Sequence, residues 1–119
     1  MAKEFELTLI RGDSYRLTFS LFNKKGEPIV LADNDMCYFT VKEKLTHEEY
    51  IFQKKYGDGI TYNSQTGLYE IRLSPEDTCD LDFASYKFDI KVKIGEEIVK
   101  TILRGVLILM INVTHRCNE

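Results

Sequence analysis

Acidic residues and two histidines are the side chains of this chain that could perform acid–base chemistry or bind a metal ion. Seven acids lie in or near predicted turns: Asp33, Asp35, Asp58, Glu76, Asp77, Asp80 and Asp82. Paired carboxylates can act as general acid and base or ligate Ca²⁺, but these spacings match neither an EF-hand register nor another known arrangement. His115 and Cys117 could supply two zinc ligands, whereas a tetrahedral site needs four, and His47 lies far from both. We therefore expect no metal and no cofactor, and acids that act as solvated turn formers.

No segment carries the surroundings that activate a nucleophile. The chain contains neither a Gly-x-Ser-x-Gly motif nor a Cys–His signature. Gly57-Asp58-Gly59 lacks the third glycine, the lysine and the following helix of a phosphate-binding loop. Arg11-Gly12-Asp13 matches the tripeptide that integrins bind, but between two predicted strands these residues also form an ordinary turn. The residues therefore supply no motif for an enzymatic mechanism.

Composition limits which binding partners and which cellular compartment we expect for this protein. The 119 residues carry a formal charge of −3 at a pI near 5.4, with basic and acidic residues interleaved, which argues against nucleic-acid binding. Cys37, Cys79 and Cys117 form neither an even framework nor a CxxC motif, so we expect reduced thiols. The N-terminus lacks the apolar region of a signal peptide, and the longest apolar run, 106–111, is too short for membrane insertion. These features predict a soluble protein that folds in a reducing cytoplasm.

Alternation of apolar and polar residues predicts an all-β fold. The clearest strand, 86–94, reads Tyr-Lys-Phe-Asp-Ile-Lys-Val-Lys-Ile, and the turn at Gly95-Glu96-Glu97 leads into a second segment, 98–113, to form a hairpin. Further strands are predicted at 5–9, 15–21, 29–31, 36–42, 50–56, 60–63 and 68–73, with short helical turns at 45–50 and 75–79. No linker or repeat divides the chain, so we expect one antiparallel β-sandwich or barrel domain over residues 1–119.

One segment of the hairpin is more apolar than a half-exposed strand should be. It comprises Val106, Leu107, Ile108, Leu109, Met110 and Ile111. An antiparallel strand with one wet face should alternate, so something must cover the second face of this segment. The cover is either the chain's own loops or the helix at Pro75, or else another subunit, because exposed apolar patches of this kind mark interfaces. The six residues are therefore the candidate interface.

The order of motifs resembles small β-sandwich proteins from the tail and baseplate modules of tailed bacteriophages, particularly the N-terminal domain of the upper baseplate protein family. The resemblance covers nearly the whole chain. The segments that carry it are Ile10-Arg11-Gly12-Asp13-Ser14-Tyr15-Arg16-Leu17-Thr18-Phe19, the turn 23–28, Tyr38-Phe39-Thr40-Val41-Lys42, Asn63-Ser64-Gln65-Thr66-Gly67-Leu68-Tyr69, Leu73-Ser74-Pro75-Glu76-Asp77-Thr78, Tyr86-Lys87-Phe88-Asp89-Ile90 and Lys100-Thr101-Ile102-Leu103-Arg104-Gly105-Val106-Leu107. In the family's general pattern a Gly-Asp turn opens the second strand, a Leu-Ser/Thr-Pro-Glu-Asp-Thr cap begins a short helix, and Thr-x-x-x-Gly closes the sandwich.

The resemblance implies a non-enzymatic virion component, made and folded in the bacterial host cytoplasm. Its Ig-like sandwich would dock onto other phage tail or baseplate proteins and would itself form homo-oligomers. The sequence ends at Glu119, where upper baseplate proteins continue into a stalk or fibre-binding region, so the resemblance does not extend to the receptor-attachment part of the family. A free-standing adaptor, an excised domain and a prophage-encoded relative of unknown role stay open.

Two other classes of function stay open. A carbohydrate-binding module would use exposed aromatic side chains, for which the candidates are Tyr38, Tyr50, Phe52, Tyr56 and Tyr62. An enzyme or inhibitor acting inside the host cell would need convergent polar groups in a deep pocket.

Overall fold

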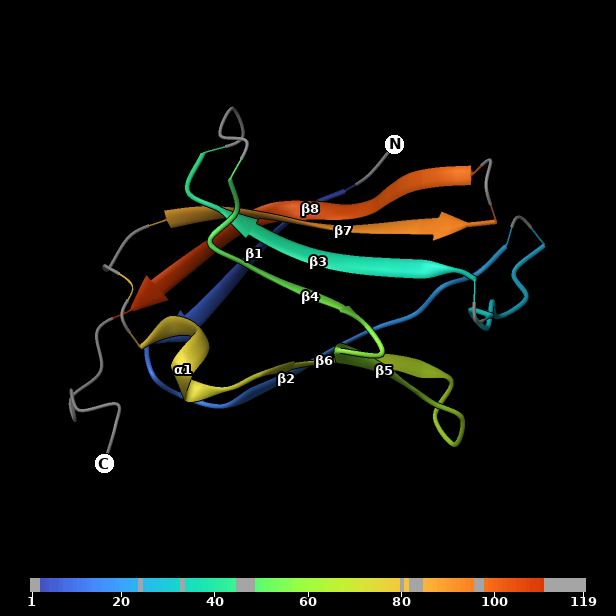
Figure 1. Ribbon diagram of the computed structural model, residues 1–119, viewed down its shortest axis with the longest axis horizontal. Helices are drawn as coiled ribbons and strands as arrows, with labels where there is room; N and C mark the ends of the chain where they lie inside the picture. Colours follow the sequence, from blue (N-terminus) through green and yellow to red (C-terminus); the bar gives the residue numbers. More distant parts are fainter. Residues whose placement is uncertain are drawn as a thin grey trace.

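The strands of the protein form one hydrogen-bonded sheet. The computed structural model describes residues 3–23, 25–32, 34–44, 49–79, 81, 85–95 and 98–110. In chain order the elements are β1 (Lys3–Ile10), β2 (Tyr15–Phe19), β3 (Met36–Lys42), β4 (Phe52–Tyr56), β5 (Gly59–Asn63), β6 (Leu68–Leu73), α1 (Pro75–Thr78), β7 (Ser85–Ile94) and β8 (Ile98–Met110). The eight strands follow the order β1-β8-β7-β3-β4-β5-β6-β2 across the sheet (Figure 1).

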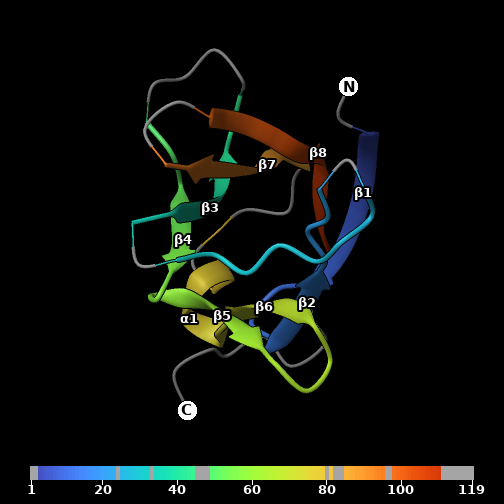
Figure 2. The ribbon, with the colours of Figure 1, turned by 90° about the vertical axis from the view of Figure 1, so that its right-hand side faces the viewer.

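The sheet curls into a half-barrel. In the end view the strands bend round from β1 and β8 through β3 and β4 to β5 and β6, and the two edge strands β1 and β2 lie on the same side (Figure 2). The prediction of an all-β fold is confirmed. The continuous ladder is not clearly a two-sheet sandwich, because β4 and β5 connect the two halves through the pairs Lys55↔Gly59 and Tyr56↔Ile60.

The expectation of purely antiparallel pairing is wrong at two places. β1 runs parallel to β8, from Lys3↔Leu103 to Ile10↔Met110, and β4 runs parallel to β5. Gly57 and Gly59 have φ angles of 91° and 102°, a backbone region that glycine enters without steric cost. The chain therefore turns at this point into the other half of the sheet instead of folding back as a hairpin.

The predicted hairpin of β7 and β8 is confirmed. The strands pair antiparallel from Ser85↔Ile108 to Ile94↔Ile98, with a register shift between Ile90 and Lys91. The apolar positions of β7 face the core and are buried: Tyr86, Phe88, Ile90 and Val92. The alternation of residues thus identified both the strand and its inner face.

Two shorter predictions have other outcomes. Residues 29–31 form no strand; this segment is irregular and is held to residues 21–22 by the hydrogen bond from Ile29 N to Leu21 O at 2.9 Å and by an isolated Phe22↔Pro28 bridge. The helical turn predicted at 45–50 falls largely on residues 45–48, outside the described part of the chain. The turn predicted at Pro75 is confirmed as α1.

Aromatic rings from both halves of the sheet meet in the core. The Phe39 and Phe88 centroids lie 5.7 Å apart, and Phe19 stacks on Tyr69 at 5.2 Å. Phe39 and Tyr69 are fully buried. Each of these pairs lies within one half of the sheet, and the Tyr56 ring of β4, 6.0 Å from the Tyr69 ring of β6, joins the two halves.

Candidate functional site

The predicted interface segment divides between the two faces of β8. Leu107 and Leu109 are 1% and 2% exposed and belong to the core. Val106 and Ile108 are half-buried on the opposite face, Met110 is exposed there, and Ile111 lies outside the described residues. The interface hypothesis therefore applies only to every second residue of the segment.

A small apolar surface remains on the outer face of the sheet. It comprises Ile10, Val106, Ile108 and Met110, which we call the β8 outer patch; Ile10 is the ladder partner of Met110. Ile10 and Met110 are 42% and 48% exposed, so no described segment covers this end of the patch. The expected cover, α1, is instead hydrogen-bonded to the β1–β2 turn.

Hydrogen bonds link that turn to α1 and to Leu81, shortly after it. The Gly12 amide donates to Thr78 Oγ1 at 2.8 Å, and the Arg11 guanidinium donates to the Leu81 carbonyl at 3.2 Å. Thr78 is 2% exposed. Arg11 and Gly12 are thus packed against the fold and do not form the free loop tip that integrin binding requires.

The five candidate aromatic residues separate into two groups. Phe52, Tyr56 and Tyr62 pack against the core, with Tyr62 and Tyr56 centroids 4.9 and 6.0 Å from that of Tyr69. Tyr38 and Tyr50 instead line a surface hollow of about 320 Å³. Of the five candidates Tyr50 is exposed, at 51%, and Tyr38 is half-buried beside it in the hollow.

Polar groups complete this hollow, which we call the tyrosine hollow. Besides the two tyrosines it is lined by Thr40, Lys42, Gln53, Asp89 and Lys91. Gln53 Nε2 donates to Thr40 Oγ1 at 2.9 Å. Burial raises the pKa of the Asp89 carboxyl above its usual value, while Lys91 and Lys42 act in the opposite direction. The hollow therefore offers aromatic faces beside hydrogen-bonding groups.

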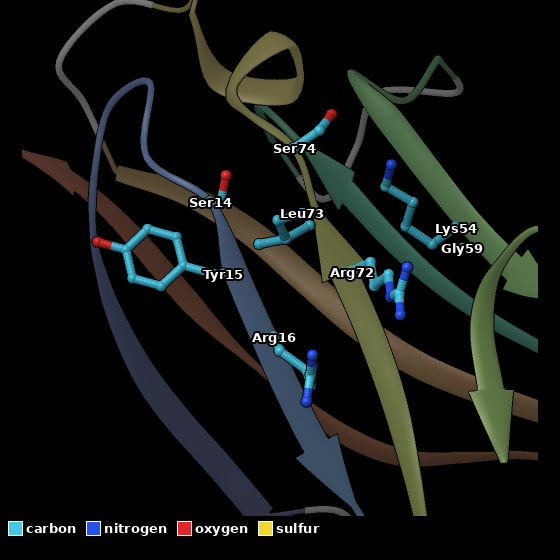
Figure 3. A pocket seen from close by; sticks show the side chains of 8 residues that line it. All are labelled: Ser14, Tyr15, Arg16, Lys54, Gly59, Arg72, Leu73 and Ser74. Carbon is cyan, nitrogen blue, oxygen red and sulfur yellow. The ribbon is translucent and has the colours of Figure 1, made fainter. Parts of the chain in front are cut away.

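A larger hollow of about 540 Å³ lies where β2 and β5 begin and β6 ends, beside the middle of β4, and we call it the basic pocket. Its lining residues are Ser14, Tyr15, Arg16, Lys54, Gly59, Arg72, Leu73 and Ser74 (Figure 3). Three of them are cationic and none is acidic. Sequence reasoning missed this pocket, since Arg16 and Arg72 come together only through the β2–β6 ladder.

Those acidic residues proposed for chemistry that the structure describes do not converge on one site. Asp35 accepts hydrogen bonds from the Ala32 and Gly95 amides at 2.8 and 2.9 Å, and Asp77 binds Lys54 at 2.8 Å. Within the described residues no group of three His, Cys, Asp or Glu side chains could hold a metal ion. His47, His115, Cys117, Asp33, Asp80 and Asp82 lie outside those residues.

The prediction of reduced thiols holds for only one of the two described cysteines. Cys37 is a free thiol, fully buried in β3. Cys79 is disulfide-bonded, so for this residue the prediction is wrong. An odd number of cysteines leaves room for one disulfide and one free thiol, which the spacing alone could not distinguish.

No model of a known protein family matches the chain, and no curated protein matches it.

No helix in the described part of the chain is long and apolar enough to cross a membrane.

Proposed function

We propose that the protein is a non-enzymatic docking module of a phage or prophage tail or baseplate. It would bind neighbouring tail proteins and further copies of itself through the β8 outer patch. The observation that carries this proposal is the exposure of Ile10 and Met110, which are paired in the β1–β8 ladder and extend the apolar stripe of Val106 and Ile108. Apolar residues gathered on a rigid sheet face suit a protein interface.

We also infer that the half-barrel is an Ig-like sandwich joined along one edge. The β4–β5 connection consists of two residue pairs, Lys55↔Gly59 and Tyr56↔Ile60. If it is set aside, the strand order divides into a group of five, β1-β8-β7-β3-β4, and a group of three, β5-β6-β2. Both groups bury their inner faces in one core, which is the principle of an Ig-like sandwich.

The family proposal gains support from contacts between its motifs. The Gly-Asp turn and the Pro-Glu-Asp-Thr cap meet through the 2.8 Å hydrogen bond from Gly12 N to Thr78 Oγ1. The glycine of Thr-x-x-x-Gly, Gly105, pairs with Phe5 of β1 and Phe88 of β7. Because these motifs contact one another in the folded chain, their joint presence supports the family proposal.

The proposed location is the virion, after folding in the cytoplasm of the bacterial host. The disulfide at Cys79 fits this sequence of events, since such bonds persist on virions and in other oxidising surroundings but are rare in the cytoplasm.

The genes that flank this one test the phage assignment. Tail-module genes on both sides are the expected result, and metabolic genes would contradict it.

Light scattering tests the interface. The native chain should form a dimer or larger oligomer, and Met110→Lys should shift it to the monomer by placing a charge in the β8 outer patch. Val99→Lys is the matched control, since Val99 is an equally apolar and exposed residue of the same strand, 57% exposed. A native monomer at high protein concentration, or equal effects of the two variants, would exclude self-association through this patch.

Carbohydrate binding is a second candidate, favoured by the tyrosine hollow. Tyr38 and Tyr50 lie beside Gln53 and Asp89, so aromatic faces and hydrogen-bonding groups share one site. Titration with oligosaccharides of glucose, galactose and N-acetylglucosamine, followed by tyrosine fluorescence, should show binding that Tyr50→Ala abolishes. Phe22→Ala, which removes another exposed ring, should leave it unchanged. Absence of binding across the three sugars would count against this function.

A further inference from the structure

We propose that the basic pocket binds a tetrahedral oxyanion, a phosphate or sulfate group that is either free in solution or carried by a small molecule. The proposal is independent of the docking function, because the pocket and the β8 outer patch share no residue. Its central feature is a pair of arginines on neighbouring strands.

Arg16 and Arg72 are direct partners in the antiparallel β2–β6 ladder. Directly opposed residues have Cβ atoms about 5 Å apart on the same face, and like charges in this position destabilise a sheet. Figure 3 shows both side chains on the same side of the two strands. A doubly negative anion between the guanidinium groups would attract both arginines and so offset their mutual repulsion. Arginine also forms paired hydrogen bonds with the oxygens of such anions.

Neighbouring carboxylates do not neutralise the two arginines. Arg16 Nε lies 4.0 Å from Glu70 Oε1, and the Arg16 side chain is 61% exposed, so this contact is weak. Glu70 is also within 3.5 Å of the Asn63 amide. Among the described residues Arg72 has no ion pair. The positive potential of the arginine pair is therefore available to a ligand.

Lys54 is a third cation in the pocket lining, and because Asp77 pairs with its charge, the arginines supply the free positive charge. Its Nζ lies 2.8 Å from Asp77 Oδ2, and both side chains are largely buried, at 19% and 15% exposure. Asp77 also accepts the Ser74 amide at 2.8 Å, so this carboxylate is committed to the cap of α1. A Cβ at Gly59 would lie 2.7 Å from Lys54 Cδ, which means that the glycine leaves room for the lysine stem.

The Ser14 hydroxyl completes the donor set, whereas Ser74 Oγ donates to Asp77 Oδ2 at 3.3 Å. Ser14 precedes β2 and Ser74 follows β6, so both lie at the same end of the arginine ladder (Figure 3). A hydroxyl donor beside guanidinium groups matches the acceptor oxygens of phosphate or sulfate. A tetrahedral ligand could contact the arginines on one side and Ser14 on the other.

Isothermal titration and NMR chemical-shift mapping at constant ionic strength test the site, with sodium phosphate, sodium sulfate and phenyl phosphate as probes and chloride as background. We expect saturable shifts at Arg16, Arg72 and Ser14, and affinity that is about tenfold or more weaker in Arg72→Gln and in Arg16→Gln. Arg104→Gln is the matched control, an exposed arginine on β8, and should leave affinity unchanged. Binding of inorganic phosphate or sulfate would assign the site to the free ion, and binding of phenyl phosphate alone to an esterified group.

Thermal unfolding separates ligand binding from a structural role. In chloride buffer of low ionic strength, Arg72→Gln should raise Tm, because it removes the like-charge pair. Added phosphate should raise the Tm of the native protein and of Arg104→Gln but not that of Arg72→Gln. The proposal is overturned if none of the three probes binds, or if Arg104→Gln weakens binding as much as Arg72→Gln does.

Discussion

The hydroxyl group of Tyr69 holds the irregular segment that connects β2 to β3. It accepts a hydrogen bond from the Leu31 amide at 2.9 Å and donates one to the Ile29 carbonyl at 2.8 Å. Tyr69 and Leu31 are both buried. This segment, which forms no strand, is thereby tied to β6, and the Leu31 amide and the Ile29 carbonyl find partners inside the protein.

Tyr69→Phe should destabilise the protein by about 1–3 kcal/mol, because it leaves the buried Leu31 amide without its acceptor. Tyr62→Phe is the control: its ring also packs on Tyr69, at 4.9 Å between centroids, but its hydroxyl does not hold the segment. Urea unfolding gives the two free energies, and hydrogen exchange at Leu31 reports the local effect. Similar losses in the two variants would refute the role of the Tyr69 hydroxyl.

Local sequence patterns predicted the elements with strong periodicity or capping. β7 was predicted because Tyr86, Phe88, Ile90 and Val92 alternate with polar residues, and this period depends only on neighbours along the chain. α1 was predicted from Ser74 and Pro75, whose backbone preferences are equally local. Such signals need no knowledge of what packs against them.

Features that depend on distant pairing could not be predicted. The parallel ladder joins Lys3 to Leu103, and alternation within a strand does not specify the direction of its partner. The basic pocket exists because Arg16 is paired with Arg72, while each arginine alone is an ordinary residue on a polar face. Which of the five candidate aromatic rings pack in the core depends on the curl of the sheet, and this curl arises from pairing between distant strands.

The two faces of β8 should respond differently to charge. Leu109→Lys should unfold the protein or destabilise it by several kcal/mol, because Leu109 is 2% exposed and a buried ammonium would lack a partner. Met110→Lys, one residue further on the outer face, should stay folded and change stability by about 0.5 kcal/mol or less. Circular dichroism and urea unfolding of both variants measure this contrast. A folded Leu109→Lys of native stability would mean that the strand faces were assigned wrongly.

Gly105 allows β1 to approach β8 closely. A Cβ at this position would clash with the backbone carbonyl oxygen of Phe5, so Gly105→Ala must displace β1. We expect a loss of about 3 kcal/mol, at the upper end for overpacking, and faster hydrogen exchange along β1. Arg104→Ala, at the exposed neighbouring position, should cost far less. Native-like stability of Gly105→Ala would show that β1 can shift without loss.

Cys37 should be inert in the folded protein. Burial raises the pKa of its thiol to about 12, and the side chain is fully inaccessible, so at pH 8 neither thiolate nor reagent access is available. A thiol-reactive disulfide reagent should modify no described free cysteine in native buffer and should modify Cys37 once urea unfolds the chain. Mass spectrometry locates the label. Rapid labelling of Cys37 in the absence of urea would contradict the packing of β3.

The Asp35 carboxylate should make stability depend on pH. Hydrogen bonds from the Ala32 and Gly95 amides lower the pKa of Asp35 below its ordinary value of 3.8, and they connect the turn before β3 to the β7–β8 hairpin. Because the folded-state pKa is the lower one, this stabilisation is fully present above pH 3.8 and is lost as the pH falls through the folded-state value. Asp35→Asn should therefore lower Tm at pH 7, and its difference from the native protein should shrink as the pH falls below 3.8. Asp58→Asn is the control, since the Asp58 side chain makes no hydrogen bond within the described residues, and its Tm difference should be small at every pH. If the two variants show the same pH profile, the amide hydrogen bonds to Asp35 do not contribute to stability.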